Sequence, residues 1–168
     1  MSARIIGFAV AAFGLITDQA LKLWLLLEFD LYNKVANNGP IHLTSYFDLI
    51  LAWNKGVSFG LFQQDDPLGQ IVLIMVAALA AGLLVAWIRR MQFGLPAAAA
   101  GLILGGAIGN AFDRIMHGAV VDLFHFYWGD FSWYVFNLAD VWIVLGVLLL
   151  VYDSFFGPSA KAEKAAGK

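Results

Sequence analysis

Long apolar runs separated by polar breaks dominate the chain. Four of these runs are long enough to cross a bilayer, which takes roughly 20 mostly apolar residues in a helix. They cover about 5–27, 68–88, 93–115 and 135–156. The pattern therefore predicts four transmembrane helices. In a chain of 168 residues, we expect them to form one integral membrane domain over 1–157.

The polar break at 28–67 has a strand-like pattern of its own. Its part IHLTSYFDLILAWNKGVSFGLF mixes β-branched and aromatic residues, and Asn-Asn-Gly-Pro and Asp-Asp-Pro flank it. Such segments predict strands bounded by turns. We expect a small antiparallel sheet between the first and second helices, and an aromatic hairpin at 116–134. The small polar residues of 158–168 predict a flexible tail. The fold class is thus an all-α membrane protein with a small β-sheet.

Composition supports a membrane location and narrows the chemistry. Hydrophobic residues make up 61% of the chain and charged residues only 13%, whereas a soluble domain has about 25% charged residues. The net charge of -2 gives no reason to expect a nucleic-acid partner. The chain has no cysteine, which excludes disulfides, thiolate metal sites and a cysteine nucleophile.

The basic residues predict how the chain is oriented. Lys and Arg are enriched at the cytoplasmic ends of membrane helices. Both termini are therefore expected in the cytoplasm, and the segments 28–67 and 116–134 are expected outside. Six of the ten basic residues lie on the side assigned to the cytoplasm, namely Arg4, Arg89, Arg90, Lys161, Lys164 and Lys168.

The first apolar run contains charged residues, which distinguishes it from a cleaved signal sequence. Asp18 and Lys22 are four positions apart, so they share a helix face and can pair. A paired charge is much less costly in a membrane than a lone one, and we expect a structural ion pair. A Ser-Lys protease is disfavoured because Ser45, Ser58 and Ser132 all lie on the outer segments.

Two other helices each present an amide and a carboxylate near the outer interface. Asn110, Asp113 and Arg114 lie at i, i+3 and i+4 on the third helix. Asn137 and Asp140 lie at i and i+3 on the fourth. These spacings place each set on one helix face.

Asp122 completes this polar cluster from the segment that joins the two helices. A hairpin between neighbouring antiparallel helices brings its two ends together, so Asp122 is expected to meet Asp140. An aspartic protease fits the residue types, because one of two adjacent carboxyls keeps a proton and the other activates water. An ion-coupled transporter and a purely structural network are alternatives. A metal hydrolase is a further alternative, with ligands drawn from His117, His125, Asp113 and Asp122.

Five motifs together resemble those of one family. They are DQALK at 18–22, NKGVSFG at 54–60, GGAIGNAFDR at 105–114, VVDLF at 120–124 and FNLAD at 136–140. In this order and on a chain of this length, they resemble the bacterial lipoprotein signal peptidases (signal peptidase II). The resemblance covers nearly everything but the tail.

The resemblance implies an intramembrane aspartic endopeptidase of the bacterial inner membrane. Such enzymes remove the signal peptide from prolipoproteins that carry a diacylglyceryl group, cutting just before the lipidated cysteine. Asp122 and Asp140 match the family's catalytic pair. In the family, polar residues around the pair contact substrate or hold the aspartates, and the matching residues of this chain are Asn54, Asn110, Arg114 and Asn137. The positions treated as structural match Asp18, Lys22 and Asp113.

The resemblance also implies a setting for the reaction. The outer sheet corresponds to a periplasmic β-cradle, and the active site is expected near the periplasmic face. No metal or other cofactor is expected. The expected partners are the lipid-modified prolipoprotein and membrane lipid, with no nucleic acid, and a single groove makes a monomer sufficient.

Overall fold

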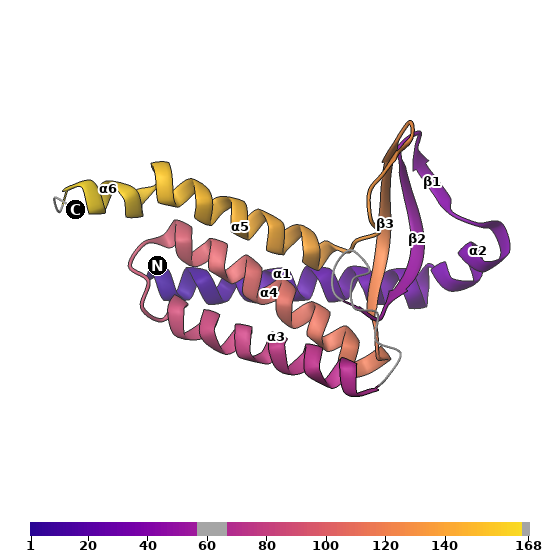
Figure 1. Cartoon of the computed structure of the whole chain (residues 1–168), viewed down its shortest axis with the longest axis horizontal. Coiled ribbons are helices and arrows are strands. Elements are labelled where there is room, and N and C mark those ends of the chain that lie inside the picture. Colours follow the sequence, from indigo (N-terminus) through magenta and orange to yellow (C-terminus); the bar gives the residue numbers. More distant parts are fainter. Residues whose placement is uncertain (57–66, 166–168) are drawn as a thin grey trace.

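Four long helices lie side by side and a small sheet stands across one end of them (Figure 1). The computed structural model describes residues 1–56 and 67–165. The long helices are α1 (Ala3–Leu23), extended by one π-helical turn η1 (Trp24–Glu28), α3 (Pro67–Ile88), α4 (Gly94–His117) and α5 (Leu138–Phe156). The short helices are α2 (Leu31–Asn38) and α6 (Pro158–Ala165). The strands are β1 (Ile41–Thr44), β2 (Phe47–Asn54), β3 (Val120–Trp128) and β4 (Phe131–Ser132).

The four predicted membrane helices are confirmed. Helices long and apolar enough to cross a membrane cover Ala3–Glu28, Leu68–Ile88, Gly94–His117 and Leu138–Ala162. The fourth begins a few residues later than expected. Its predicted first turn is extended instead, because the backbone of Phe136 exchanges hydrogen bonds with Phe124 of β3.

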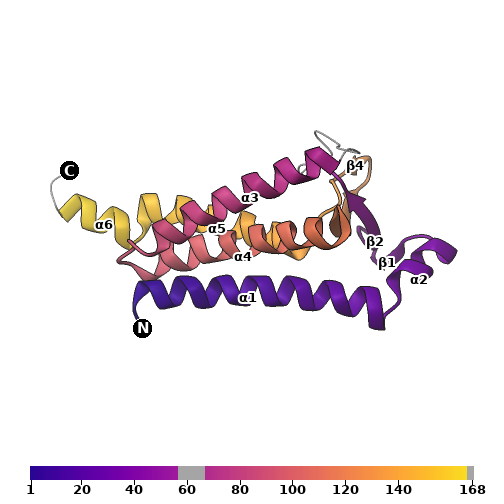
Figure 2. The ribbon, with the colours of Figure 1, turned by 90° about the horizontal axis from the view of Figure 1, so that it is seen from below.

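Helix α4 lies at the centre of the bundle and packs against α1, α3 and α5 (Figure 2). In its sequence, glycines recur every four residues at 101, 105 and 109, a spacing that predicts close packing of another helix on that face. A Cβ atom at Gly105 would collide with the carbonyl oxygen of Ala11 on α1. At Gly109, a Cβ atom would lie 2.8 Å from the carboxylate of Asp18. These glycines thus bring α1 close enough for its polar residues to reach α4.

The sheet is antiparallel throughout, with strand order β1-β2-β3-β4. The predicted small sheet is confirmed, but half of its strands come from the segment expected to form only an aromatic hairpin. The pairing of β2 with β3 joins that hairpin to the long outer segment. An apolar core of Leu25, Leu31, Leu49, Val121 and Leu123 fixes the sheet on the end of α1. This anchors β3, which carries Asp122, to the helices.

The tail differs from the expected flexible segment, because α6 continues it as a helix to Ala165. The carboxylate of Asp153 on α5 accepts a hydrogen bond from the backbone of Ser159 at 3.4 Å, which satisfies one free amide of the new helix. Pro158 occupies its first position, where proline is well tolerated. Residues 166–168 lie outside the described residues.

Candidate active site

Asp122 lies on β3 and is almost completely buried, with 3% of its surface exposed. Two amide side chains donate hydrogen bonds to it. Asn54 Nδ2 at the end of β2 lies 3.0 Å from one carboxylate oxygen, and Asn137 Nδ2 lies 2.7 Å from the other. The neighbours Val121 and Leu123 point into the apolar core, and this alternation along the strand directs Asp122 the other way.

Asp140 lies in the first turn of α5, where it forms a capping box with Asn137. The side-chain oxygen of Asn137 accepts the backbone N–H of Asp140 at 3.0 Å, and the backbone N–H of Asn137 donates to the Asp140 carboxylate at 3.2 Å. The other carboxylate oxygen accepts a hydrogen bond from Asn110 Nδ2 at 2.9 Å. The start of the helix thus fixes the position of this carboxylate.

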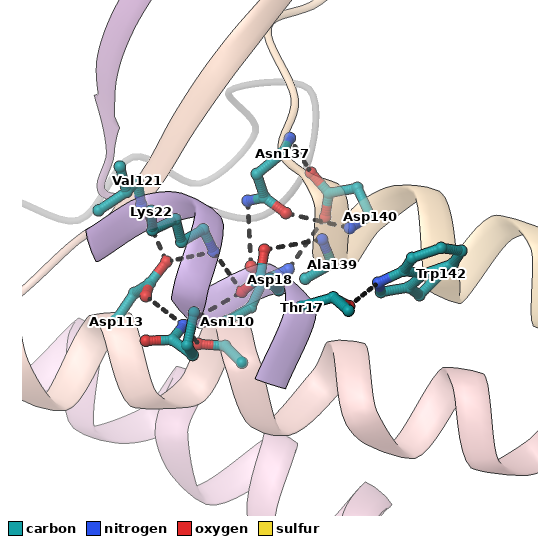
Figure 3. A network of polar contacts seen from close by, with 12 residues as sticks. Thr17, Asp18, Lys22, Asn110, Asp113, Val121, Asn137, Ala139, Asp140 and Trp142 are labelled. Carbon is teal, nitrogen blue, oxygen red and sulfur yellow. Dashed lines mark hydrogen bonds and ion pairs between the residues drawn. The ribbon is translucent and has the colours of Figure 1, made fainter. Parts of the chain in front are cut away.

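The two carboxylates are joined through the two amides. Asn137 Nδ2 donates to Asn110 Oδ1 at 3.0 Å as well as to Asp122. Asn110 in turn donates to Asp140, as Figure 3 shows. The structure thus brings together the four predicted residues Asp122, Asp140, Asn110 and Asn137, while the catalytic role of the two aspartates stays a prediction.

Burial gives Asp122 an unusual protonation behaviour. Loss of solvation and, after it, the nearby charge of Asp140 raise the pKa of the Asp122 carboxyl from 3.8 to about 7. The hydrogen bonds from Asn54 and Asn137 oppose this rise. A carboxyl with such a pKa exchanges a proton near neutral pH, which general acid–base chemistry requires.

Arg114 lies one helical turn beyond Asn110 on α4. Its guanidinium donates to the backbone carbonyls of Gly56 at 2.8 Å and Asn110 at 3.3 Å. Its Nε is buried, and no described residue accepts a hydrogen bond from it. The side-chain oxygen of Asn54 accepts the backbone N–H of Gly56 at 3.0 Å. Arg114 and Asn54 thus hold the end of β2 against the carboxylates.

A network of buried charged side chains on α1 and α4 lies next to the carboxylate pair. Lys22 Nζ lies 2.8 Å from Asp18 and 2.7 Å from Asp113, so the expected pair is a triplet that joins α1 to α4. Gln19 donates to both carboxylates, at 3.1 and 2.9 Å. From the sequence, Gln19 is expected to satisfy Asp18 and Lys22 within the first span; its bond to Asp113 on α4 is the part that the sequence does not predict.

The same two carboxylates also hold the backbone beside each candidate catalytic residue (Figure 3). Asp18 accepts the N–H of Ala139, next to Asp140, at 2.9 Å. Asp113 accepts the N–H of Val121, next to Asp122, at 3.1 Å. One charged triplet therefore sets the relative position of α5 and β3.

The histidines lie apart from the carboxylate pair and bond elsewhere. His42 contacts Asp48 at 2.7 Å, and His125 contacts Ser132 at 2.8 Å. Within 1–56 and 67–165, no three His, Asp or Glu side chains are grouped as a metal site would need. The described geometry also leaves Lys22 engaged with two carboxylates rather than with a serine. Ser58, one of the serines considered, lies outside the described residues.

An apolar cavity of about 380 Å³ opens beside Asp140 and runs along the outer face of α5. Asp140 supplies the carboxylate among its lining residues, and the remainder are apolar or aromatic. They are Trp133, Tyr134, Phe136, Val141, Val144, Leu145 and Leu148. The cavity can hold a hydrocarbon chain with its polar end at the carboxylate.

Comparisons with known proteins agree with the sequence resemblance. A model of the family described as signal peptidase (SPase) II matches residues 10–156. Similar proteins include the lipoprotein signal peptidase of Nitrobacter hamburgensis, 52% identical over 93% of this chain and 96% of that protein. That of Rhodopseudomonas palustris is 48% identical over 94% of this chain and 96% of that protein. A solved bacterial membrane enzyme has the same fold, with a TM-score of 0.72 at 22% identity over 88% of both chains.

Proposed function

The chain belongs to the signal peptidase II family, and from this premise we propose that it is an aspartic endopeptidase in which Asp122 and Asp140 form the catalytic pair. Its substrates are prolipoproteins that already carry a diacylglyceryl group, and it cuts the peptide bond just before the lipidated cysteine. The observation that carries the proposal is the pair itself. Two desolvated carboxylates from different elements are linked through two amides, with an apolar cavity beside them.

The pair supplies both the base and the acid for hydrolysis. The ionised carboxylate takes a proton from a water molecule, whose oxygen attacks the scissile carbonyl carbon. The protonated carboxyl gives its proton to the carbonyl oxygen, which produces a tetrahedral intermediate. When the C–N bond breaks, the leaving nitrogen takes a proton from the first aspartate. A hydroxyl group of the intermediate returns its proton to the second aspartate as the carbonyl re-forms, so the pair is back in its starting state. The proton belongs to the pair, because coupled carboxyls titrate as a unit.

The residues around the pair place the substrate. Asn54 and Asn110 each use one amide N–H on an aspartate, so the second N–H of each, together with the Nε of Arg114, can donate to peptide carbonyls near the cut site. Asn137 donates both of its amide N–H groups to Asp122 and Asn110 and therefore holds the pair. The cavity along α5 holds a hydrocarbon part of the substrate. All the reacting groups, apart from the attacking water molecule and the substrate, come from one chain. We therefore propose that a monomer is active.

We further propose an orientation in the inner membrane, with both termini in the cytoplasm and the pair near the periplasmic face. The excess of Lys and Arg around the α3–α4 turn and after α5 supports it. Because the chain lacks cysteine, single-cysteine variants can test it. In intact cells, a membrane-impermeant maleimide should label Asp130→Cys at the sheet tip but not Lys161→Cys on α6. The reverse pattern would invert the proposed orientation.

The function is tested by cleavage of a synthetic precursor in detergent. Purified protein should cut the diacylglyceryl-modified precursor and leave its unlipidated twin intact. Mass spectrometry should find the diacylglyceryl-cysteine at the new N-terminus. Equal cleavage of both precursors would reject lipid recognition, and a product cut elsewhere would reject the proposed position. Failure of a folded protein to cut either precursor would reject the activity.

A further inference from the structure

The α3–α4 turn and the start of α6 lie at the end of the bundle opposite the sheet (Figure 1). A second cavity is lined by residues of this end. It has a volume of about 330 Å³ and lies among the end of α3, the α3–α4 turn, the start of α4 and the α5–α6 junction. Unlike the cavity at Asp140, it is lined by groups of both charge signs. The residues around it include Trp87, Arg90, Gln92, Asp153, Ser154 and Ser159.

Asp153 is the anionic group of this cavity and is only 4% exposed. One of its carboxylate oxygens, Oδ1, accepts the long hydrogen bond from the Ser159 backbone. Among the described residues, nothing donates to Oδ2, and no cation pairs with the side chain. A side chain at position 157 would collide with this carboxylate, and Gly157 leaves room for it. Oδ2 is not among the enclosed atoms that lack a partner, and Asp153 lines the cavity, so a cationic group held in the cavity can reach this carboxylate.

Arg90 is the cationic group of the same cavity. It lies two residues beyond the end of the span at Ile88 and is exposed. Its guanidinium makes no hydrogen bond or ion pair with any described side chain, including that of Asp153. The cavity therefore offers a separate anion site and cation site, which favours a zwitterionic ligand over a simple ion.

The position of the cavity relative to the apolar spans identifies the class of ligand. Trp87, 47% exposed, lies at the end of its span, where tryptophan gathers at the boundary between hydrocarbon and headgroups. Apolar side chains also line the cavity itself, namely Met91, Phe93, Pro96 and Leu150. A ligand held here has its polar part at the interface and apolar chains against the helices.

We propose that this cavity binds the headgroup of a phospholipid that carries a primary amine, with its phosphate on Arg90 and its ammonium on Asp153. An arginine guanidinium donates two parallel hydrogen bonds to phosphate oxygens. A primary ammonium donates hydrogen bonds to a carboxylate, whereas a trimethylated one has no N–H to donate. The site is separate from the catalytic pair, so it stands or falls independently of the proposed peptidase activity.

The test is lipid competition measured by native mass spectrometry on the delipidated protein. Phosphatidylethanolamine should be retained roughly tenfold better than phosphatidylcholine or phosphatidylglycerol. This ratio is no larger than the loss of one charge-assisted hydrogen bond, the one to Asp153, would produce. Asp153→Asn should abolish the preference for ethanolamine over choline, and Arg90→Gln should weaken the retention of all three lipids. The matched control is Arg89→Gln, since Arg89 is adjacent and does not line the cavity.

Either of two outcomes would overturn the proposal. The wild type retains all three lipids equally, or Arg89→Gln loses as much lipid retention as Arg90→Gln. Displacement of bound lipid by soluble glycerophosphoethanolamine at equal concentration would show that the headgroup alone is recognised, rather than a membrane lipid. Asparagine can replace aspartate in the hydrogen bond to Ser159, and thermal unfolding verifies that each variant is folded. If Asp153→Asn does not fold, the comparison of the two arginine variants decides.

Discussion

Asn137 connects the catalytic chemistry to the local fold. Its side chain caps α5 through its oxygen and donates through its nitrogen to both Asp122 and Asn110. It is fully buried, so each of these bonds is protected from competing water. Asn137, the residue that begins α5, therefore also fixes the positions of the two carboxylates relative to each other.

Replacing Asn137 by alanine should impair both stability and cleavage. Loss of the cap costs about 1 kcal/mol, and the groups left without a buried partner cost about 1–3 kcal/mol more. We expect a lower melting temperature by differential scanning fluorimetry and slower precursor cleavage. Asn33→Ala is the matched control, because Asn33 is exposed and its side chain bonds to Asp30. If both variants behave alike, Asn137 does not hold the site.

The raised pKa of Asp122 predicts how cleavage depends on pH. Because burial raises this pKa to about 7, the pair loses its remaining proton as the pH rises through that value. Single-turnover cleavage should therefore fall above about pH 7 as the acid form of the pair disappears. A rate that stays constant or increases from about pH 6 to about pH 9 would contradict this assignment of the acid.

The same raised pKa makes stability depend on pH. In the unfolded chain, the Asp122 carboxyl has a pKa of 3.8, and in the native protein its pKa is about 7. Between these two pH values, Asp122 of the native protein keeps the proton that the unfolded chain has lost. Its contribution to stability is therefore complete below pH 3.8 and is lost as the pH rises through about 7. Asp122→Asn should remove this dependence, which thermal unfolding at a series of pH values would reveal.

At the scale of elements, the close contact between α1 and α4 determines whether the polar residues of α1 reach the site. Gly105 packs against the carbonyl of Ala11, and Gly109 packs against Asp18. The spacing of these glycines in the sequence predicted close packing but did not identify the partner helix. The hydrogen bond between Asp18 and Ala139 forms only because α1, and not another helix, packs against these glycines.

Two matched glycine variants test this packing. Gly105→Ala should destabilise the protein by about 1–3 kcal/mol, because the added methyl group forces α1 and α4 apart. Gly82→Ala on α3 is the control, since, apart from the backbone of its own helix, no atom of the described residues lies within 4 Å of the methyl position there. Alanine also favours the helix at that position, so this variant should be neutral or slightly stabilised. Equal melting temperatures for the two variants would contradict the account of the α1–α4 contact.

In the whole molecule, the Lys22 triplet joins α1, α4, β3 and α5. Removing the lysine leaves the carboxylates of Asp18 and Asp113 buried without a cation. Lys22→Met should cost about 3–5 kcal/mol, as for other buried pairs that lose one partner. The variant should unfold at a lower temperature and cleave precursor slowly even when folded. Lys34→Met, at an exposed lysine, is the control, and a Lys22 variant as stable as this control would argue against the triplet.

The sequence predicts the membrane spans, the candidate pair and its amides, because apolar length and helical spacing are local properties. It does not predict that β3 and β4 complete the sheet, since strand pairing between distant segments has no local signal. Nor does it predict that Asp153, six positions upstream of Ser159, accepts an amide at the start of α6. The roles of Asp18 and Asp113 in holding Ala139 and Val121 arise only when three helices and a strand come together.

The most direct test compares the cleavage rates of variants at the two aspartates of the pair with the rate of a control variant at Asp48. Asp122→Asn and Asp140→Asn keep the size of the side chain but remove its proton transfer. Each should slow single-turnover cleavage of lipidated precursor by at least about 10²–10⁴-fold. Asp48→Asn, at a buried aspartate of the sheet bonded to His42 and Tyr127, should retain most activity. Near-normal cleavage by either dyad variant would contradict the assignment of the catalytic pair.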